Sequence, residues 1–224
     1  FNGEATASKL ARVREQMEKE AAQYHIISTL DDIAWILNVR GNDIPHVPVV
    51  LSFLVIGKED AMWFVEENAL SDAVKEMAAE CGIIIRPYEE VYTYAATIPE
   101  HSTVLLDKRK VNYRITNALS ETVHIVSKAN PSQLMKAIKN EIELENTRKA
   151  HLLDGIAVTK FMYWLKKNVG KIPMDEVSVS DYLQSLREQM EGYRDISFDT
   201  IAGYNANAAM MHYKAEPDTA AKLE

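Results

Sequence analysis

The sequence predicts an α/β domain with a mixed or mostly parallel sheet, followed by a helical segment that opens a second, β-containing domain. Two observations lead to this fold class. Apolar runs of strand length alternate with stretches of helix length up to about residue 127, and such alternation with short links is typical of α/β domains. The segment "KANPSQ" ends this pattern, and residues 132–170 consist almost entirely of helix-forming residues.

The first predicted element is an amphipathic helix over residues 8–23. Leu10, Val13 and Met17 recur there at helical spacing, with charged residues between them. Ser8 can cap the start of this helix, because its hydroxyl can accept a hydrogen bond from an unpaired backbone N–H group. The chain therefore opens with a helix that covers an apolar surface.

A short strand over residues 24–29 and a helix over residues 30–41 come next. Asp31 and Asp32 would lie in the first turn of this helix, where capping and the helix dipole favour carboxylates. Gly41 follows the predicted end of the helix, a position that glycine commonly occupies. Both aspartates are thus explained as capping and dipole residues.

The apolar residues 47–57 predict a buried strand, which the chain enters through a loop containing Pro45 and Pro48. The elements that follow alternate regularly between the two periodicities. Strands are predicted at residues 61–68, 83–88, 102–107 and 122–127, and helices at residues 69–82, 89–98 and 113–121.

The second domain begins with a long helix from about residue 141 to residue 168, closed by Gly170. A further helix over residues 178–191 would have Ser178 or Ser180 as its cap. The long helix must pack on a large surface, because its apolar residues form one broad face. This face consists of Ala150, Leu153, Ala157, Phe161 and Trp164, widened by Leu152, Ile156 and Met162.

Residues 195–213 predict a strand, a polar loop and a second, buried strand that carries His212. Two helices and one strand pair expose more apolar surface than they can cover, and unpaired strand edges promote aggregation. We therefore expect the chain to be a fragment. The remaining strands would lie on another piece of chain, or this end would be poorly ordered.

Composition restricts the kind of partner. The 224 residues are 47% apolar and 26% charged, as in soluble globular proteins, and their 33 acidic and 25 basic side chains give a net charge of −8. Interspersed basic residues form no patch for nucleic acid. The longest apolar run has about half of the ~20 residues that a membrane span requires. A single cysteine, Cys81, favours a reducing, cytoplasmic environment.

Local motifs point to no complete active site. A lone histidine in an apolar strand, as predicted for His212, is more often a packed residue than a catalytic one. His151 and Asp154 face the same way on the long helix, but two ligands do not form a metal site, and we interpret them as a solvated pair. The carboxylates of Glu141, Glu143 and Glu145 alternate around the helix and cannot converge.

Signatures of other chemistries are absent from the sequence. It contains no His-Glu-x-x-His motif, no glycine-rich phosphate loop and no Gly-x-Ser-x-Gly nucleophile elbow. Cys81 stands beside Gly82 with no evident base, so nothing indicates a thiol nucleophile. Residue patterns alone therefore lead to an α/β domain joined by helices to an unfinished β-containing domain.

Three blocks resemble the three-domain aminopeptidase P (Xaa-Pro aminopeptidase) family. Residues 28–50 resemble its pattern Leu-Asp-x-x-Ala-Trp-x-x-Asn-x-Arg-Gly-x-Asp-x-x-x-x-Pro-Val. Residues 137–165 resemble its Lys-Asn-x-x-Glu…Arg-x-Ala-His…Asp junction, and residues 197–213 resemble its Ser-Phe-x-Thr-Ile…His-Tyr run. The matched positions are Leu30, Asp31, Ala34, Trp35, Asn38, Arg40, Gly41, Asp43, Pro48, Val49, Lys139, Asn140, Glu143, Arg148, Ala150, His151, Asp154 and His212.

The resemblance implies a division into two parts. Residues 1–128 would be the family's middle, creatinase-like domain, which is not catalytic, and the preceding domain of the family would be absent. Residues 129–224 would be the N-terminal part of the pita-bread metallopeptidase domain, truncated before its end. His212 would be the family's active-site histidine, which helps to orient or stabilise the substrate carbonyl near the scissile bond.

The resemblance also implies a cofactor that this chain lacks the groups to hold. Family members bind two divalent metal ions, usually manganese, through carboxylates and a histidine that follow the His-Tyr step. Only Glu216, Asp218 and Glu224 follow that step here, outside the expected motifs. We therefore expect no metal ligands in this chain and no metal bound to it.

The implied activity belongs to the intact parent. It would release the N-terminal residue from peptides with proline in second position, in the cytoplasm and as a homodimer, whereas the 224-residue segment would be inactive. Two alternatives remain open at this point: a prolidase or creatinase relative with the same fold, and a pita-bread module that has lost its metals and binds peptides or proteins.

Overall fold

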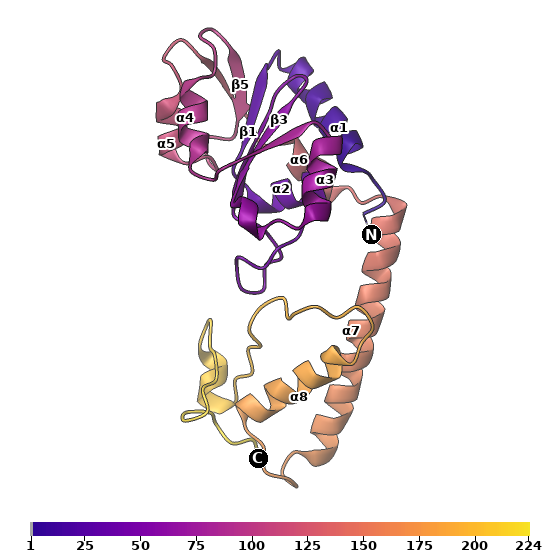
Figure 1. The fold of residues 1–224 in the computed structure, drawn as a ribbon. Coiled ribbons are helices and arrows are strands. Elements are labelled where there is room, and N and C mark those ends of the chain that lie inside the picture. The colour runs from indigo at the N-terminus through magenta and orange to yellow at the C-terminus, as the bar shows by residue number, and fades with distance from the viewer. Residues whose placement is uncertain (1) are drawn as a thin grey trace. The chain divides into compact units, whose positions relative to one another are not determined.

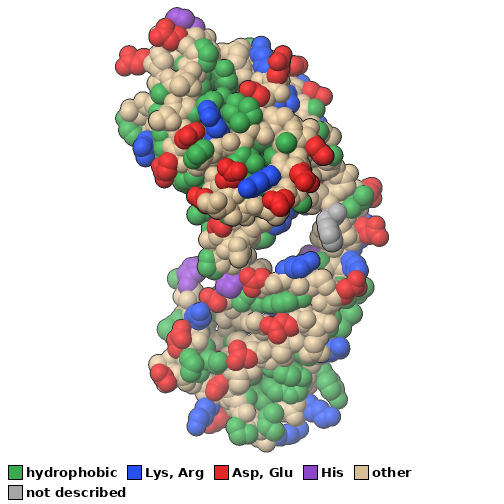
Figure 2. Space-filling model, in the orientation of Figure 1, with side chains coloured by type: hydrophobic (Ala, Val, Ile, Leu, Met, Phe, Trp, Pro, Cys, Tyr) green, Lys and Arg blue, Asp and Glu red, His purple; other side chains and the backbone are tan. Residues whose placement is uncertain are grey.

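The computed structural model describes residues 2–224, and the chain divides into two compact units, Phe1–Ile142 and Glu143–Glu224. The first unit contains the sheet and the second is built around two helices (Figure 1). No helix in the described part of the chain is both long and apolar enough to cross a bilayer. Acidic and basic side chains are intermixed over the visible face of each unit (Figure 2).

The first unit contains a six-stranded mixed sheet in the order β4-β3-β2-β1-β5-β6. Neighbouring strands run parallel except for the pairs β1–β2 and β2–β3, which are antiparallel. The mixed α/β sheet predicted from the sequence is therefore confirmed. The strands are β1 (Tyr24–Ile27), β2 (Ser52–Ile56), β3 (Ala61–Val65), β4 (Ile83–Arg86), β5 (Thr103–Leu106) and β6 (His124–Ser127).

Helices cover both faces of this sheet. Helices α4 and α5 lie on one face, and α1, α2, α3 and α6 lie on the other (Figure 1). The helices are α1 (Thr6–Lys19), α2 (Leu30–Leu37), α3 (Asp72–Glu80), α4 (Glu90–Ala96), α5 (Tyr113–Ala118) and α6 (Pro131–Ala137), with a 3₁₀ turn, η1 (Glu67–Ala69), before α3.

The period of two along each strand separates two cores. In β2, Phe53 and Val55 contribute to the core beneath α4 and α5, whereas Leu54 and Ile56 contribute to the core beneath α1, α2 and α3. All of β2 is buried, because helices cover both sides of the sheet. Trp63 in β3 is fully buried in the second of these cores.

The end of α2 differs from the prediction. The residue that closes the helix is Asn38, with φ 57° in the left-handed region, and not Gly41. Asparagine tolerates this conformation, and its side chain is held in place: Lys9 Nζ, fully buried, donates to Asn38 Oδ1 at 2.6 Å and to the carbonyl of Trp35 at 2.8 Å. Helix α1 begins at Thr6, so Ser8 lies inside it and is not its cap.

The two aspartates at the start of α2 lie in its first turn as predicted, and they also make tertiary contacts. Asp32 is buried, and its Oδ2 accepts hydrogen bonds from Thr29 Oγ1 at 2.6 Å and from Asn130 Nδ2 at 3.1 Å. Lys136 on α6 forms ion pairs with both Asp31 and Asp32. These contacts hold α6 against α2 on the same face of the sheet.

The second unit contains α7 (Glu141–Asn168) and α8 (Glu176–Glu188), which lie side by side (Figure 1). Gly170, with φ 71°, follows α7 as predicted. The predicted caps of α8 are wrong, because Asp175 is the N-cap. Its carboxylate accepts from the N–H of Ser178 while the Ser178 hydroxyl accepts from the N–H of Asp175, which forms a capping box.

The predicted apolar face of α7 is only partly covered by the described residues. Ala157 is buried at its centre, and Trp164 stacks on Tyr182 of α8 with 4.0 Å between ring centroids. Leu152, by contrast, is 66% exposed. Packing against α8 therefore accounts for the part of the face nearest Trp164, and the expectation of a large packing surface is met in part.

The strands predicted within residues 195–213 are wrong for this structure. Among the described residues from 189 to 224 there is one 3₁₀ helix, η2 (Asn205–Ala209), and one isolated bridge between Asp175 and Lys222. A strand needs a neighbour for its backbone groups, and a hairpin alone is marginal in water. Instead, the backbone N–H groups of Tyr204 and Ala221 donate hydrogen bonds to the side chain of Glu176, which hold this segment.

A buried histidine links the stability of the sheet to pH. His25 in β1 is fully buried, and its Nδ1 lies 3.0 Å from the carbonyl oxygen of Leu105, so this nitrogen carries the proton. Burial lowers the pKa of His25 from 6.5 to about 4, although the Leu105 carbonyl and Asp32 act in the opposite direction.

We predict that the first unit loses stability as the pH falls from 6.5 to about 4, because the unfolded chain then binds a proton that folded His25 does not. The loss should reach roughly 3 kcal/mol. Urea unfolding followed by amide exchange in β1 and β5 measures it. His25→Phe should remove most of this pH dependence and exposed His124→Phe should not; equal slopes in both variants would contradict the assignment.

Candidate active-site segment

The side chain that organises the second unit is Glu176, the first residue of α8. Glu176 is 1% exposed, and its carboxylate accepts hydrogen bonds from donors far along the chain. Oε1 accepts from the backbone N–H of Tyr204 at 2.6 Å, and Oε2 accepts from the Tyr213 hydroxyl at 2.6 Å and from the N–H of Ala221 at 2.8 Å. Asn207 Nδ2 lies 3.1 Å from both oxygens.

These donors set the charge state of the network. Burial by itself raises the pKa of Glu176, but the hydrogen bonds from Tyr213, Ala221, Tyr204 and Asn207 outweigh it and lower the pKa to about 2. Glu176 is therefore ionised at neutral pH. The hydrogen bond to Glu176, together with burial and the negative charge of Glu176, raises the pKa of Tyr213 to about 12. The Tyr213 hydroxyl therefore keeps its proton at neutral pH and remains a donor.

The histidine singled out from the sequence lies beside this network. His212 directly precedes Tyr213 and follows Met211, which is 90% exposed. His212 is exposed and has φ 56°, so it lies in a turn and not in the predicted buried strand. The exposed imidazole is accessible to a ligand, and the next residue, Tyr213, is hydrogen-bonded to Glu176.

The network was not foreseen from the sequence. Glu176 stands near Asp175 at the start of a helix, where carboxylates are common for reasons of capping alone. Its donors Tyr204, Tyr213 and Ala221 are 28, 37 and 45 residues away, so no local pattern joins them. The one available signal was a tyrosine next to the candidate histidine.

Glu176 also borders a mainly apolar cavity of about 330 Å³ within the second unit. The cavity lies between α7, α8 and the segment from Thr200 to Tyr204. Its apolar lining includes Phe161 and Leu165 from α7, Val179 and Leu183 from α8, and Ile201 and Leu223. The cavity places apolar surface on one side of the Glu176 network.

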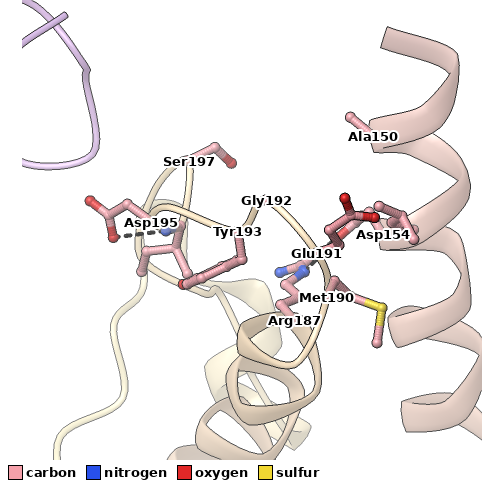
Figure 3. A pocket seen from close by; sticks show the side chains of 11 residues that line it. Ala150, Asp154, Arg187, Met190, Glu191, Gly192, Tyr193, Asp195 and Ser197 are labelled. Carbon is pink, nitrogen blue, oxygen red and sulfur yellow. Dashed lines mark hydrogen bonds and ion pairs between the residues drawn. The ribbon is translucent and has the colours of Figure 1, made fainter. Parts of the chain in front are cut away.

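A second pocket, of about 280 Å³, lies between α7 and the loop after α8 (Figure 3). There Arg187 Nε donates to Asp154 Oδ1 at 2.7 Å. Glu191, at the rim of this pocket, forms an ion pair with Lys149 at 3.2 Å. His151 and Asp154 are both exposed, as expected for a solvated pair, and Asp154 in addition has a basic partner from α8.

The described residues alone do not fit a pair of metal ions. Within residues 2–224, no three His, Cys, Asp or Glu side chains lie close enough together to hold a metal. The oxygens of Glu176 are already occupied by donors from four residues. Glu216, Asp218 and Glu224 lie exposed near the end of the chain.

The sheet topology and the two-unit organisation define a class of protein. Residues 1–143 match the Creatinase/Prolidase N-terminal domain family, and residues 145–224 match Metallopeptidase family M24. Because the first match covers more than half of the chain, the chain belongs to the creatinase/prolidase N-terminal domain family over that region. The domain family expected from the sequence is confirmed.

Relatives within this class are Xaa-Pro aminopeptidases. The chain is 37% identical to a probable Xaa-Pro aminopeptidase P from Neurospora crassa, over 96% of this chain and 33% of the relative. It is 35% identical to Xaa-Pro aminopeptidase 1 from Dictyostelium discoideum, over 100% of this chain and 36% of the relative. The chain thus spans about a third of the length of these relatives.

Solved structures agree with this assignment. X-prolyl aminopeptidase from Caenorhabditis elegans, described as a cytosolic enzyme with a di-nuclear active site, superimposes with a TM-score of 0.82 and 28% identity, over 88% of this chain and 33% of that enzyme. A prolidase from Pyrococcus horikoshii superimposes with a TM-score of 0.63 and 19% identity, which supports the shared fold alone.

We predict that Glu176→Gln lowers the melting temperature of the second unit at pH 7 by several degrees, because Gln replaces an acceptor oxygen with a donor. The folded pKa lies below the ordinary 4.5, so the ionised carboxylate stabilises the fold above pH 4.5 and this contribution is lost as the pH falls toward 2. The variant should therefore lose less stability over that pH range. Thermal unfolding at several pH values, with Glu191→Gln as control, measures this; identical acid profiles for Glu176→Gln and the parent chain would contradict it.

The ion pair in the pocket of Figure 3 should contribute little. Asp154→Asn is expected to destabilise the second unit by less than about 1 kcal/mol, because the carboxylate is half exposed and the pair is screened by solvent. Urea unfolding with and without 1 M salt tests this expectation. A loss above about 2 kcal/mol would show that this pair is structurally essential.

Proposed function

We propose that this chain supplies the creatinase-like domain and the first part of the metallopeptidase domain of an Xaa-Pro aminopeptidase. Such an enzyme releases the N-terminal residue from peptides that have proline in second position. The observation that carries this proposal is that Xaa-Pro aminopeptidases align with the whole chain, through both units, at 35% identity. The C. elegans structure, with its TM-score of 0.82, supports the same reaction class.

His212 is the residue of this chain that acts at the reaction centre in this proposal. Its exposed imidazole can donate a hydrogen bond to the carbonyl oxygen of the scissile bond. Such a donor stabilises the negative charge that develops as the carbonyl carbon becomes tetrahedral. The Tyr213 hydroxyl donates to Glu176, so in this proposal His212 is the member of the pair that would contact substrate.

The proposal includes two divalent metal ions, manganese in the cell, held by residues other than those of this chain. Two metal ions would supply an activated water and polarise the carbonyl. The di-nuclear active site named for the C. elegans enzyme supports the number of ions. The 224-residue chain by itself would then be inactive, and the intact enzyme would act in the cytoplasm as a homodimer.

Among related reactions, a prolidase activity is the main competitor, since the matching domain family is named for both creatinase and prolidase. The 37% identity to an Xaa-Pro aminopeptidase, against 19% to the P. horikoshii prolidase, favours the aminopeptidase. An assay separates the two, because a prolidase accepts the dipeptide and an aminopeptidase accepts longer peptides. Binding of peptides without turnover would indicate the metal-free binding module.

The test compares the intact protein with the 224-residue chain on an Xaa-Pro-Xaa tripeptide in the presence of Mn²⁺. We expect turnover by the intact protein only. In the intact protein His212→Gln should lower kcat by about 100-fold with little change in KM, because the lost hydrogen bond forms mainly in the transition state. His101→Gln, an exposed histidine of the first unit, is the matched control. Turnover by the short chain, or an unaffected His212→Gln enzyme, would contradict the proposal.

A further inference from the structure

We infer that Glu176 is a positioning residue for His212: its buried carboxylate tethers the chain on both sides of the histidine and so sets where the imidazole lies. The inference rests on the proposed role of His212. It assigns to Glu176 no contact with substrate, only control of the segment that contacts substrate.

The tethers bracket the histidine along the chain. Tyr204 N–H and Asn207 Nδ2 bind the carboxylate ahead of His212, at 2.6 and 3.1 Å. The Tyr213 hydroxyl binds it immediately after His212, at 2.6 Å. The N–H of Ala221 binds the carboxylate further along the chain, at 2.8 Å. The segment from residue 204 to residue 221 is therefore attached to the Glu176 side chain at both ends and next to His212.

The anchor itself is held on a fixed element. The capping box between Asp175 and Ser178 fixes the first turn of α8, from which Glu176 projects. Backbone hydrogen bonds join this turn to the end of the chain, from Glu176 N–H to the Ala221 carbonyl at 3.2 Å and from Leu223 N–H to the Met174 carbonyl at 3.0 Å. The carboxylate therefore offers a rigid reference point for the His212 segment.

The backbone conformation at His212 also indicates that the surrounding structure constrains this residue. Its φ of 56° lies in the left-handed region, which residues other than glycine adopt at a cost. A residue keeps this conformation only when the surrounding structure imposes it. The hydrogen bond of the adjacent Tyr213 to Glu176 is the constraint nearest to that strained position.

The ionised carboxylate of Glu176 is matched to its hydrogen-bond partners, and a neutral side chain could not make the same set of bonds. An ionised carboxylate only accepts hydrogen bonds, and all of its partners here donate: two backbone N–H groups, one amide and one hydroxyl. A glutamine of the same shape would turn an N–H group toward these donors. Tyr213→Phe removes only the Tyr213 hydroxyl and leaves the other hydrogen bonds to Glu176 in place. Its effect on the His212 segment should therefore be smaller than that of Glu176→Gln.

The first test uses the 224-residue chain and needs no activity. In two-dimensional NMR spectra, Glu176→Gln should shift the amide signals of Tyr204 and Ala221 and the imidazole signals of His212. Glu191→Gln, a change to an exposed carboxylate in the same unit, should leave them unchanged. Unmoved His212 signals in a folded Glu176→Gln chain would overturn the inference.

The second test uses the intact enzyme. Glu176→Gln should lower kcat by about 10- to 100-fold with KM and metal content within about twofold of the parent, as expected for a misplaced catalytic group. Tyr213→Phe should give a smaller loss, and it carries the test if Glu176→Gln fails to fold. In a His212→Gln background the same changes should have almost no further effect, because their action runs through His212.

The outcomes separate the inference from the proposed function. Equal losses from Glu176→Gln with and without His212 would show a general structural role and overturn the inference. An intact protein that does not hydrolyse Xaa-Pro peptides would refute the proposed function, while the NMR shifts would still decide whether Glu176 holds the His212 segment.

Discussion

The second unit depends on one interaction, the set of hydrogen bonds that converge on the buried carboxylate of Glu176. The residues after α8 contain no strand in the described structure, so they cannot satisfy their backbone groups in a sheet. The segment is held instead by hydrogen bonds to one charged acceptor, the Glu176 carboxylate. The donors are the backbone N–H groups of Tyr204 and Ala221 and the side chains of Asn207 and Tyr213. An ionised acceptor forms stronger hydrogen bonds than a neutral one, which explains how one side chain organises so long a segment.

The first unit rests on a different principle, apolar burial on two faces of one sheet. Strands β1, β2 and β5 lie in the middle of the sheet order and are covered by helices on both sides. Polar groups enter this core where they link elements: Lys9 ties α1 to the end of α2, and Asp32 links α2 to Asn130 and Lys136. Burial of apolar side chains provides most of the stability, and these few polar contacts join neighbouring helices within the core.

The sequence predicted the first unit well because its signals are local. The strands around Phe53, Trp63 and Leu105 follow from periodicity and composition, and so does the long helix from Glu141 that leads into the second unit. Helix ends were less predictable: Asn38 closes α2 in place of Gly41 because a tertiary contact with Lys9 holds it. The Glu176 network escaped prediction entirely, since it joins residues far apart in sequence, and the strand expected at His212 assumed a sheet that the described residues do not form.

The measurement that tests the central claim most directly is the pKa of the Glu176 carboxyl, followed by carbon-13 NMR as the chain is titrated with acid. A carboxylate that gathers these donors should titrate near pH 2. A carboxyl that titrates near its ordinary value of 4.5 would show that the donors do not converge on it, and the account of how the His212 segment is held would be wrong.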